Sequence, residues 1–234
     1  MSKTALVLTF LLLLGTLSMA QSPNVEPATT PEKRVPNISF EYTLAGADPG
    51  AYSLTVESTG AAAYRADDET GPNATPSGDP YIQKFVLSPA TAQRIFDLAR
   101  SLNYFHGDFE YHGGRVANMG AKTLIYRDAG AESRTSYNYS TNPQMQQLTA
   151  IFQGIATTLA HGRRLERLYR FDKLGLDAEL RAFENDVKNK FATEIQVDGD
   201  ILNRIANDSA VMNISRRRAQ ELISMVHTQE QAKQ

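Results

Sequence analysis

The sequence predicts an α+β fold, a mainly antiparallel sheet with helices packed on one face, plus a helical C-terminal segment. Short stretches that alternate apolar and polar residues fill much of the first half of the chain. This two-residue period is typical of strands with one buried face. The first four stretches follow one another too closely for crossover helices, so neighbouring strands are expected to pair antiparallel. From Pro143 onward, apolar residues recur at helical spacing instead.

Four strands are expected before the first helix. The alternating pattern places them at residues 38–44, 52–56, 61–65 and 81–87. Asp48-Pro49-Gly50 and Ser58-Thr59-Gly60 are turn signals that separate the first three. Four strands, a helix, a hairpin and then helices make an order typical of a sheet covered on one face.

The first helix is expected to begin at Ser88, a favoured N-cap residue, with Pro89 in the first helical position. A hairpin should follow, with strands at residues 122–127 and 134–139 around a turn at 128–131.

The C-terminal half is expected to be helical. Gly162 is expected to interrupt the first long helix, and Ser215 is expected to cap the last one. Between them, residues 176–187 have a thin apolar stripe among many charges, which predicts a light, one-sided contact.

The N-terminus has the pattern of a cleavable secretory signal peptide. Lys3 gives a basic start, residues 5–14 form an apolar run, and Ser18 and Ala20 supply the small residues of a cleavage site. The run is shorter than the roughly 20 residues that a membrane-spanning helix needs. A periplasmic or secreted protein is therefore expected, with no transmembrane segment after signal cleavage.

The chain is expected to comprise four segments. They are a signal peptide at residues 1–20, a disordered Pro-rich linker at 21–36, an α+β domain at 37–171 and a helical appendage at 172–234.

Composition speaks against several classes of function. The 24 Lys+Arg and 26 Asp+Glu residues nearly balance, whereas a general nucleic-acid or anionic-membrane binder needs a basic excess. The absence of cysteine excludes disulfides, thiolate nucleophiles and Cys-ligated zinc, and indicates a bacterial source. No phosphate-cradling loop, dinucleotide fingerprint or hydrolase motif occurs, so no cofactor is expected.

Several motifs resemble an uncharacterised family of exported bacterial domains of unknown function. They are Tyr52-Ser53-Leu54-Thr55-Val56, Gly60 with Tyr64, Phe85-Val86-Leu87-Ser88, and Phe96 with Tyr104-Phe105. The resemblance spans about residues 38–160 and implies the fold and the compartment, but no activity. Members often carry two cysteines before the strand that contains Tyr52 here. Residues 45–51 contain none, so a role tied to those cysteines does not carry over.

His106, Asp108, Glu110 and His112 are the candidate metal ligands. In an extended segment they would share one face, and two imidazoles with two carboxylates suit Zn²⁺. The surrounding glycines favour a solvated loop instead, and no known metal motif has this form.

Other clusters have simpler interpretations. The acids of residues 67–69 with Asp79, and those of residues 198–200, do not follow the spacing of a calcium loop. The arginines at residues 163–170 and 216–218 are expected to lie on solvated helix faces, paired with nearby acids. His161 and His227 are expected on the surface or in a satisfied core. Seven aromatic residues either line a ligand groove or pack under a helix: Tyr104, Phe105, Phe109, Tyr111, Tyr126, Tyr137 and Tyr139.

The function therefore stays open between classes. The preferred hypothesis is a non-catalytic exported module that binds a protein or an envelope component. The alternative is a metal-dependent hydrolase that uses the cluster from His106 to His112. A structural accessory whose C-terminal helices pack on a partner is the third.

We expect the signal peptide to be cleaved after Ala20. The basic, apolar and small-residue regions occur in the order that signal peptidases require. Intact-mass measurement of the exported protein should give a chain that starts at Gln21. A mass that includes residues 1–20 would contradict this prediction.

Overall fold

The computed structural model describes residues 35–47, 49–67 and 80–231. The signal peptide, most of the linker, and the acidic positions Asp68, Glu69 and Asp79 lie outside these residues. The side chain of His227 lies outside them too. Expectations for these positions remain predictions.

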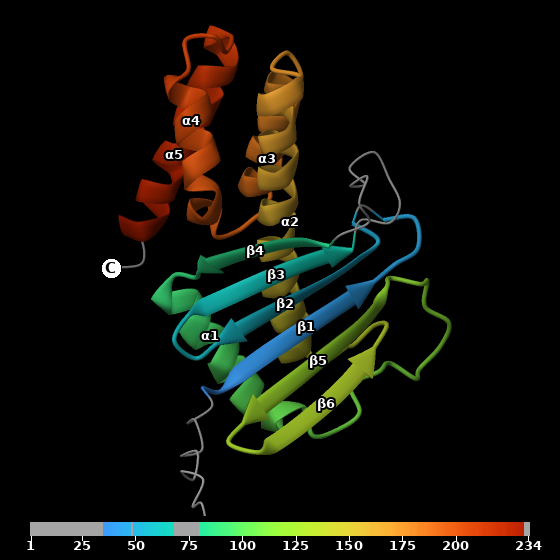
Figure 1. Ribbon diagram of the computed structural model, residues 1–234. Coiled ribbons are helices and arrows are strands. Elements are labelled where there is room, and N and C mark those ends of the chain that lie inside the picture. Colours follow the sequence, from blue (N-terminus) through green and yellow to red (C-terminus); the bar gives the residue numbers. More distant parts are fainter. Residues whose placement is uncertain (1–34, 48, 68–79, 232–234) are drawn as a thin grey trace, which may run out of the picture. The chain divides into compact units, whose positions relative to one another are not determined.

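A six-stranded antiparallel sheet forms in the order β4-β3-β2-β1-β5-β6 (Figure 1). Its strands are β1 (Asn37–Thr43), β2 (Ala51–Glu57), β3 (Ala61–Asp67), β4 (Tyr81–Val86), β5 (Ala121–Asp128) and β6 (Ala131–Tyr137). The register places Phe40 opposite Leu54 on one side and Leu124 on the other. All three side chains are fully buried, so this row forms the centre of the covered face.

Helices cover one face of the sheet and continue beyond it (Figure 1). They are α1 (Pro89–Ser101), the short 3-10 turn η1 (Asn103–Phe105), α2 (Pro143–Phe171), α3 (Leu176–Lys188), the 3-10 turn η2 (Ile195–Asp198), α4 (Gly199–Asn207) and α5 (Asn213–Gln231). The predicted α+β class, with an antiparallel sheet and a helical C-terminal segment, is confirmed. Among the described residues, no helix is both long enough and apolar enough to cross a membrane.

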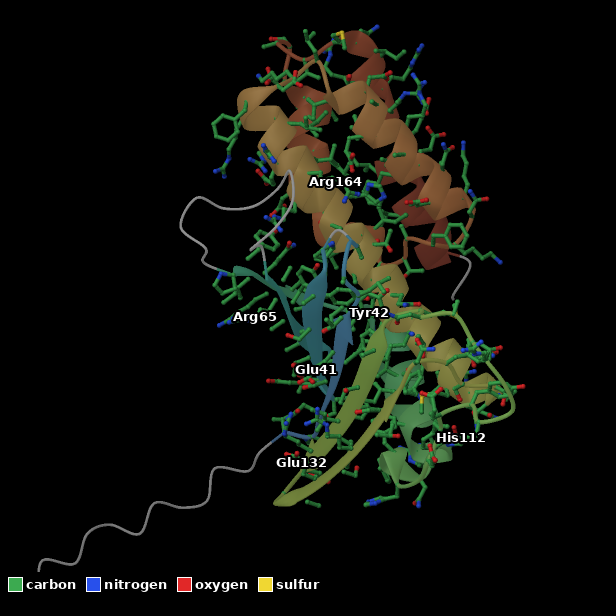
Figure 2. The ribbon with its side chains drawn as sticks, turned by 90° about the vertical axis from the view of Figure 1, so that its right-hand side faces the viewer. Glu41, Tyr42, Arg65, His112, Glu132 and Arg164 are labelled. Carbon is green, nitrogen blue, oxygen red and sulfur yellow. The ribbon has the colours of Figure 1, made fainter. Side chains whose placement is uncertain are left out.

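The opposite face of the sheet is polar. Figure 2 shows Glu41, Arg65 and Glu132 on the side away from α2, and Tyr42 on the side towards it. Ion pairs cross this outer face, with Arg134 Nη2 3.7 Å from Glu41 Oε2. One wet face and one buried face explain the two-residue period of the strands.

The start of α1 follows the prediction and gains a distant partner. The Ser88 side chain accepts a hydrogen bond from the Thr91 backbone nitrogen, and Pro89 occupies the first turn. Glu194, more than 100 residues later, accepts hydrogen bonds from the Ser88 nitrogen (2.7 Å) and from the Thr91 hydroxyl (2.5 Å). A carboxylate at a helix N-terminus is favourable because it compensates the positive end of the helix dipole.

Three local predictions are wrong. The hairpin turn is shorter than expected, since β5 runs to Asp128 and β6 starts at Ala131. Gly162 does not interrupt α2, which is one helix of 29 residues. Ser215 does not cap α5, which begins at Asn213. Ser215 shares a helix face with the buried Ala219 and Leu222, so the helical period carries it into the interior.

The C-terminal helices have a hydrophobic core of their own. Leu176, Leu180 and Phe183 of α3 are fully buried there, together with Leu165 of α2. The stripe is therefore buried more extensively than the expected light contact, because residues of α4 and α5 belong to the same core. The division at residues 171 and 172 remains a prediction.

Small residues on α2 let the segment from Ala192 to Asp198 pack closely against the helix. A Cβ atom on Gly154 would lie 2.7 Å from the Thr193 hydroxyl oxygen, and one on Gly162 would collide with the Asp198 carboxylate. Between the two glycines, the Thr158 hydroxyl donates a hydrogen bond to the Thr193 carbonyl oxygen (2.6 Å). We call Gly154, Thr158 and Gly162 the α2 seam.

Gly162→Ala should therefore destabilise the protein, although alanine favours helices. Overpacking at such a contact costs about 1–3 kcal/mol, which outweighs a helix-propensity gain of roughly 1 kcal/mol. Gly199→Ala is the matched control, since a Cβ on that helical glycine meets nothing within 4 Å. Chemical denaturation should show a loss for the first variant and no loss for the second. Equal stability of the two variants would contradict close packing at the seam.

Candidate functional site

The predicted metal ligands do not surround a common point. His112 Nε2 lies 2.8 Å from Asp108 Oδ2 in an exposed pair. Glu110 turns the other way, and its carboxylate accepts hydrogen bonds from the backbone nitrogens of Asn138 and Tyr139. Within the part of the chain that the structure describes, no three His, Cys, Asp or Glu residues form a metal-binding group.

Glu110 thus ties the 106–120 loop to the end of β6. The Tyr111 nitrogen donates to the Tyr139 carbonyl oxygen at 2.9 Å, which adds a backbone link at the same place. These backbone hydrogen bonds hold the pKa of Glu110 below its usual value. The arrangement indicates a structural role for this carboxylate.

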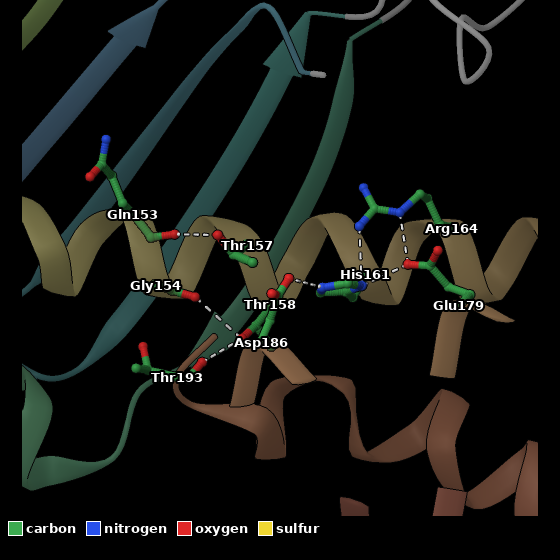
Figure 3. A network of polar contacts seen from close by, with 9 residues as sticks. All are labelled: Gln153, Gly154, Thr157, Thr158, His161, Arg164, Glu179, Asp186 and Thr193. Carbon is green, nitrogen blue, oxygen red and sulfur yellow. Dashed lines mark hydrogen bonds and ion pairs between the residues drawn. The ribbon is translucent and has the colours of Figure 1, made fainter. Parts of the chain in front are cut away.

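His161 is the buried member of a partly buried polar network between α2 and α3 (Figure 3). Its Nδ1 lies 2.6 Å from Glu179 Oε1, and its Nε2 lies 2.9 Å from Asp186 Oδ2. Arg164 Nη2 lies 3.1 Å from His161 Nδ1. Arg164 Nε also contacts Glu179 Oε1, at 2.7 Å.

The network therefore clamps α3 to α2 by charge. Burial alone would raise the pKa of Glu179, but hydrogen bonds from His161 and Arg164 hold it below its usual value. The His161 ring also stacks on Phe183, with centroids 4.6 Å apart. Both ring nitrogens of His161 have partners, as is typical of a satisfied polar cluster in a core.

Arg164 and Arg218 pair with acids of α3, whereas Arg170 pairs with Glu166 of its own helix. Arg218 contacts both Asp177 (2.8 Å) and Glu184 (3.1 Å) of α3. Arg163 lies 5.0 Å from the centre of the Tyr81 ring.

Asp198 lies in a cavity of about 160 Å³ between β4, α2 and α4. Burial raises the pKa of Asp198 to about 8, although hydrogen bonds from Gly162 and Gln83 oppose the rise. Its Oδ2 atom has no hydrogen-bond partner. The carboxyl group is therefore mainly protonated at neutral pH, which keeps an uncompensated charge out of the interior.

A larger groove lies beside α1, at the opposite end of β4. Its volume is about 720 Å³, within the usual range of ligand sites. Phe96, Tyr104 and Tyr126 line it, with Arg100 and Asp97 among its polar groups. Tyr104 and Tyr126 lie with their ring centres 4.4 Å apart. We call this cavity the aromatic groove.

The backbone beside the aromatic groove is strained. Asn103, Tyr104 and Phe105 all have positive φ angles, of 50°, 51° and 70°. Residues other than glycine lose roughly 1–2 kcal/mol each in this left-handed region. The buried Phe105 side chain and a hydrogen bond from the Ser133 hydroxyl to the Tyr104 carbonyl oxygen hold the turn in place.

Charged groups of α1 border the groove. Arg100 Nη1 lies 2.8 Å from Asp97 Oδ1, and hydrogen bonds to Tyr104 and Asp97 raise the pKa of Arg100. The groove therefore combines flat aromatic area with a permanently charged donor. This combination suits binding of a ligand that is partly apolar and partly polar.

A second groove of about 530 Å³ lies between α2 and the turn after β1. Alanines, Tyr52, Lys190 and the exposed Phe191 line it. Tyr42 and Tyr52 of this groove also form a close aromatic pair, with ring centres 5.1 Å apart. The aromatic groove is the stronger candidate because a run of left-handed residues borders it.

The sequence predicts part of the aromatic groove. Tyr104 and Tyr126 are among the aromatics considered for a ligand groove, and both line it. Phe105 and Tyr137 pack in the core instead. Phe96 and Arg100 are missed as lining residues, since their helical spacing indicates only which α1 face is buried.

A scan of the chain against protein-family models gives no match, and a search of the curated proteins gives none either. The resemblance to exported bacterial domains therefore remains a prediction.

We expect Asp198→Asn to stabilise the protein increasingly as the pH rises from 4 to 8. An unfolded Asp loses its proton near pH 4, whereas folded Asp198 retains it to about pH 8. Wild-type stability should fall through this window, by up to a few kcal/mol, and then stay level. The amide of the Asp198→Asn variant does not ionise in this range, so the variant does not lose stability in this way.

Thermal melting at pH 4 and pH 9 measures the effect. Asp200→Asn is the control, because it removes an exposed acid two residues away. A difference between Asp198→Asn and wild type that is the same at both pH values would contradict the prediction.

Proposed function

We propose that this chain is an exported, non-catalytic module that binds a partner polypeptide in the aromatic groove. The observation that carries the proposal is the left-handed turn at Asn103–Phe105, which presents Tyr104 at the wall of the groove. Strained backbone of this kind clusters at binding and catalytic sites, where the surrounding structure maintains it.

The chemistry of the groove supports a peptide ligand. Phe96, Tyr104 and Tyr126 offer rigid surfaces against which apolar side chains pack. Gln93, Asp97 and Arg100 line the same cavity and supply donors and acceptors for a peptide backbone. Aromatic and arginine side chains contribute most to binding energy at protein interfaces.

The metal-dependent hydrolase has no comparable support. Of its four proposed ligands, Asp108 and His112 form an exposed pair, whereas Glu110 is engaged with backbone nitrogens. We therefore do not carry it forward as a second function.

Selection of peptides on the purified protein tests the proposal. Peptides enriched from a random display library should lose at least about tenfold in affinity for Tyr104→Ala and for Arg100→Ala, as expected for an interface hot spot. Arg100 is largely exposed, so its replacement should leave the fold intact. Thermal melting of each variant checks this point.

Phe191→Ala is the matched control, because it removes an exposed aromatic ring from the other groove. Its affinity for the same peptides should stay within about twofold of wild type, since surface changes outside a hot spot are nearly neutral. Failure to enrich any peptide, or equal binding by wild type and both groove variants, would show the proposal to be wrong.

A further inference from the structure

Four large apolar side chains are exposed at one end of the helical part. Phe171 (82% exposed) is the last residue of α2, and Leu174 (74%) lies in the turn that follows it. Met212 (40%) lies in the turn between α4 and α5, and Ile214 (39%) lies in the first turn of α5. Both turns lie at the end of these helices farthest from the sheet (Figure 1). We call these four residues the helical tip.

Direct contacts join the two turns. Lys173 Nζ of the first turn lies 2.6 Å from Asp208 Oδ2, at the end of α4. Tyr169 lies between them, with its ring centre 4.8 Å from Lys173 Nζ and 5.4 Å from the Arg204 guanidinium carbon. The two turns therefore lie side by side at this end of the helical part.

Basic residues surround the helical tip. Residues 170–175 and 204–217 contain five basic side chains and two acidic ones. The basic ones are Arg170, Lys173, Arg204, Arg216 and Arg217. Asp208 pairs with Lys173, and Glu166 of α2 pairs with Arg170 and Arg204, whereas the Arg217 side chain is exposed. This local excess of positive charge contrasts with the net charge of −2 for the whole chain.

We propose that the helical tip docks on an anionic lipid bilayer. Exposed apolar side chains grouped at one place mark an interaction surface. Phe and Leu side chains with a basic surround are the combination that enters the headgroup region of a membrane, where anionic lipids attract Lys and Arg. The surface lies at the end of the helical part farthest from the sheet, where it can meet a bilayer without obstruction by the sheet.

This surface is distinct from the aromatic groove, so the inference does not rest on the proposed peptide binding. The near-neutral charge of the whole chain argues against general binding to anionic membranes. Docking through the tip needs only the local excess, because attraction to lipid headgroups acts within about one Debye length, roughly 8 Å.

The absence of tryptophan from the chain provides a clean test. Phe171→Trp places a single fluorophore at the helical tip. Its emission should shift to shorter wavelength with vesicles of phosphatidylglycerol and phosphatidylethanolamine, and acrylamide should quench it less. Ile82→Trp is the control, since Ile82 is also well exposed (58%) but lies on β4. Its emission should not shift.

A charge variant tests the electrostatic part. Arg217→Glu in the Phe171→Trp background should weaken vesicle binding at least about fivefold, since each basic residue near an anionic surface contributes about that factor. All proteins compared are mature chains that start at Gln21, so the apolar residues 5–14 do not contribute to vesicle binding.

Several results would overturn the proposal. They are no shift for Phe171→Trp, an equal shift for Ile82→Trp, or equal binding to vesicles of phosphatidylcholine alone. A shift caused by a protein fraction without lipid would assign the helical tip to a protein partner instead, and would equally overturn it.

Discussion

The structure depends on the close approach of one loop segment to α2. Gly154 and Gly162 lack side chains where Thr193 and Asp198 meet the helix, so the segment from Ala192 to Asp198 lies directly against it. Bulkier residues at these two positions would hold the segment away. Glu194 would then move from its position at the N-terminus of α1, where it accepts hydrogen bonds from Ser88 and Thr91. The α2 seam thus connects the C-terminal helices to the sheet.

One long helix also connects the two hydrophobic cores. Phe152 and Ile155 of α2 belong to the core under the sheet, and Leu165 belongs to the core of the C-terminal helices. At 1.5 Å per residue, a 29-residue helix is about 44 Å long, which is enough to serve both. A cut after Phe171 would leave α2 whole but expose Leu165. Leu165 therefore links the stability of α2 to the C-terminal helices.

The sequence predicts elements whose causes are local. Alternation places the strands because each has one buried and one wet face, and Ser88 with Pro89 marks the start of α1 because capping involves adjacent residues. The errors have non-local causes. In the sequence, Gly162 indicates a helix interruption. In the fold, it is a glycine because Asp198, 36 residues later, occupies the space that a side chain would need. Ser215 is predicted as a cap because serine favours that position. Its actual burial inside α5 depends on packing against other helices, which the local sequence does not show.

The candidate site is less predictable for the same reason. Its aromatic residues are visible in the sequence, but nothing local separates Tyr104, which lines the groove, from its neighbour Phe105, which is buried in the core. The left-handed turn that directs them apart contains no glycine to signal it. Tertiary contacts from Ser133 and from the core supply the compensating free energy, and these form only in the folded chain.

The proposed binding surfaces lie at separate places on the molecule, and the junction lies between them. The aromatic groove involves α1 and the turn after β2, whereas the helical tip involves the far ends of α2 and α4. Asp198 lies where β4, α2 and α4 meet, and burial raises its pKa to about 8. An exposed Asp ionises near pH 4, so the contact between the sheet and the C-terminal helices weakens as the pH rises from 4 to about 8. The groove depends on α1 and the sheet, and the tip on the second core, so each surface retains its own support when that contact weakens.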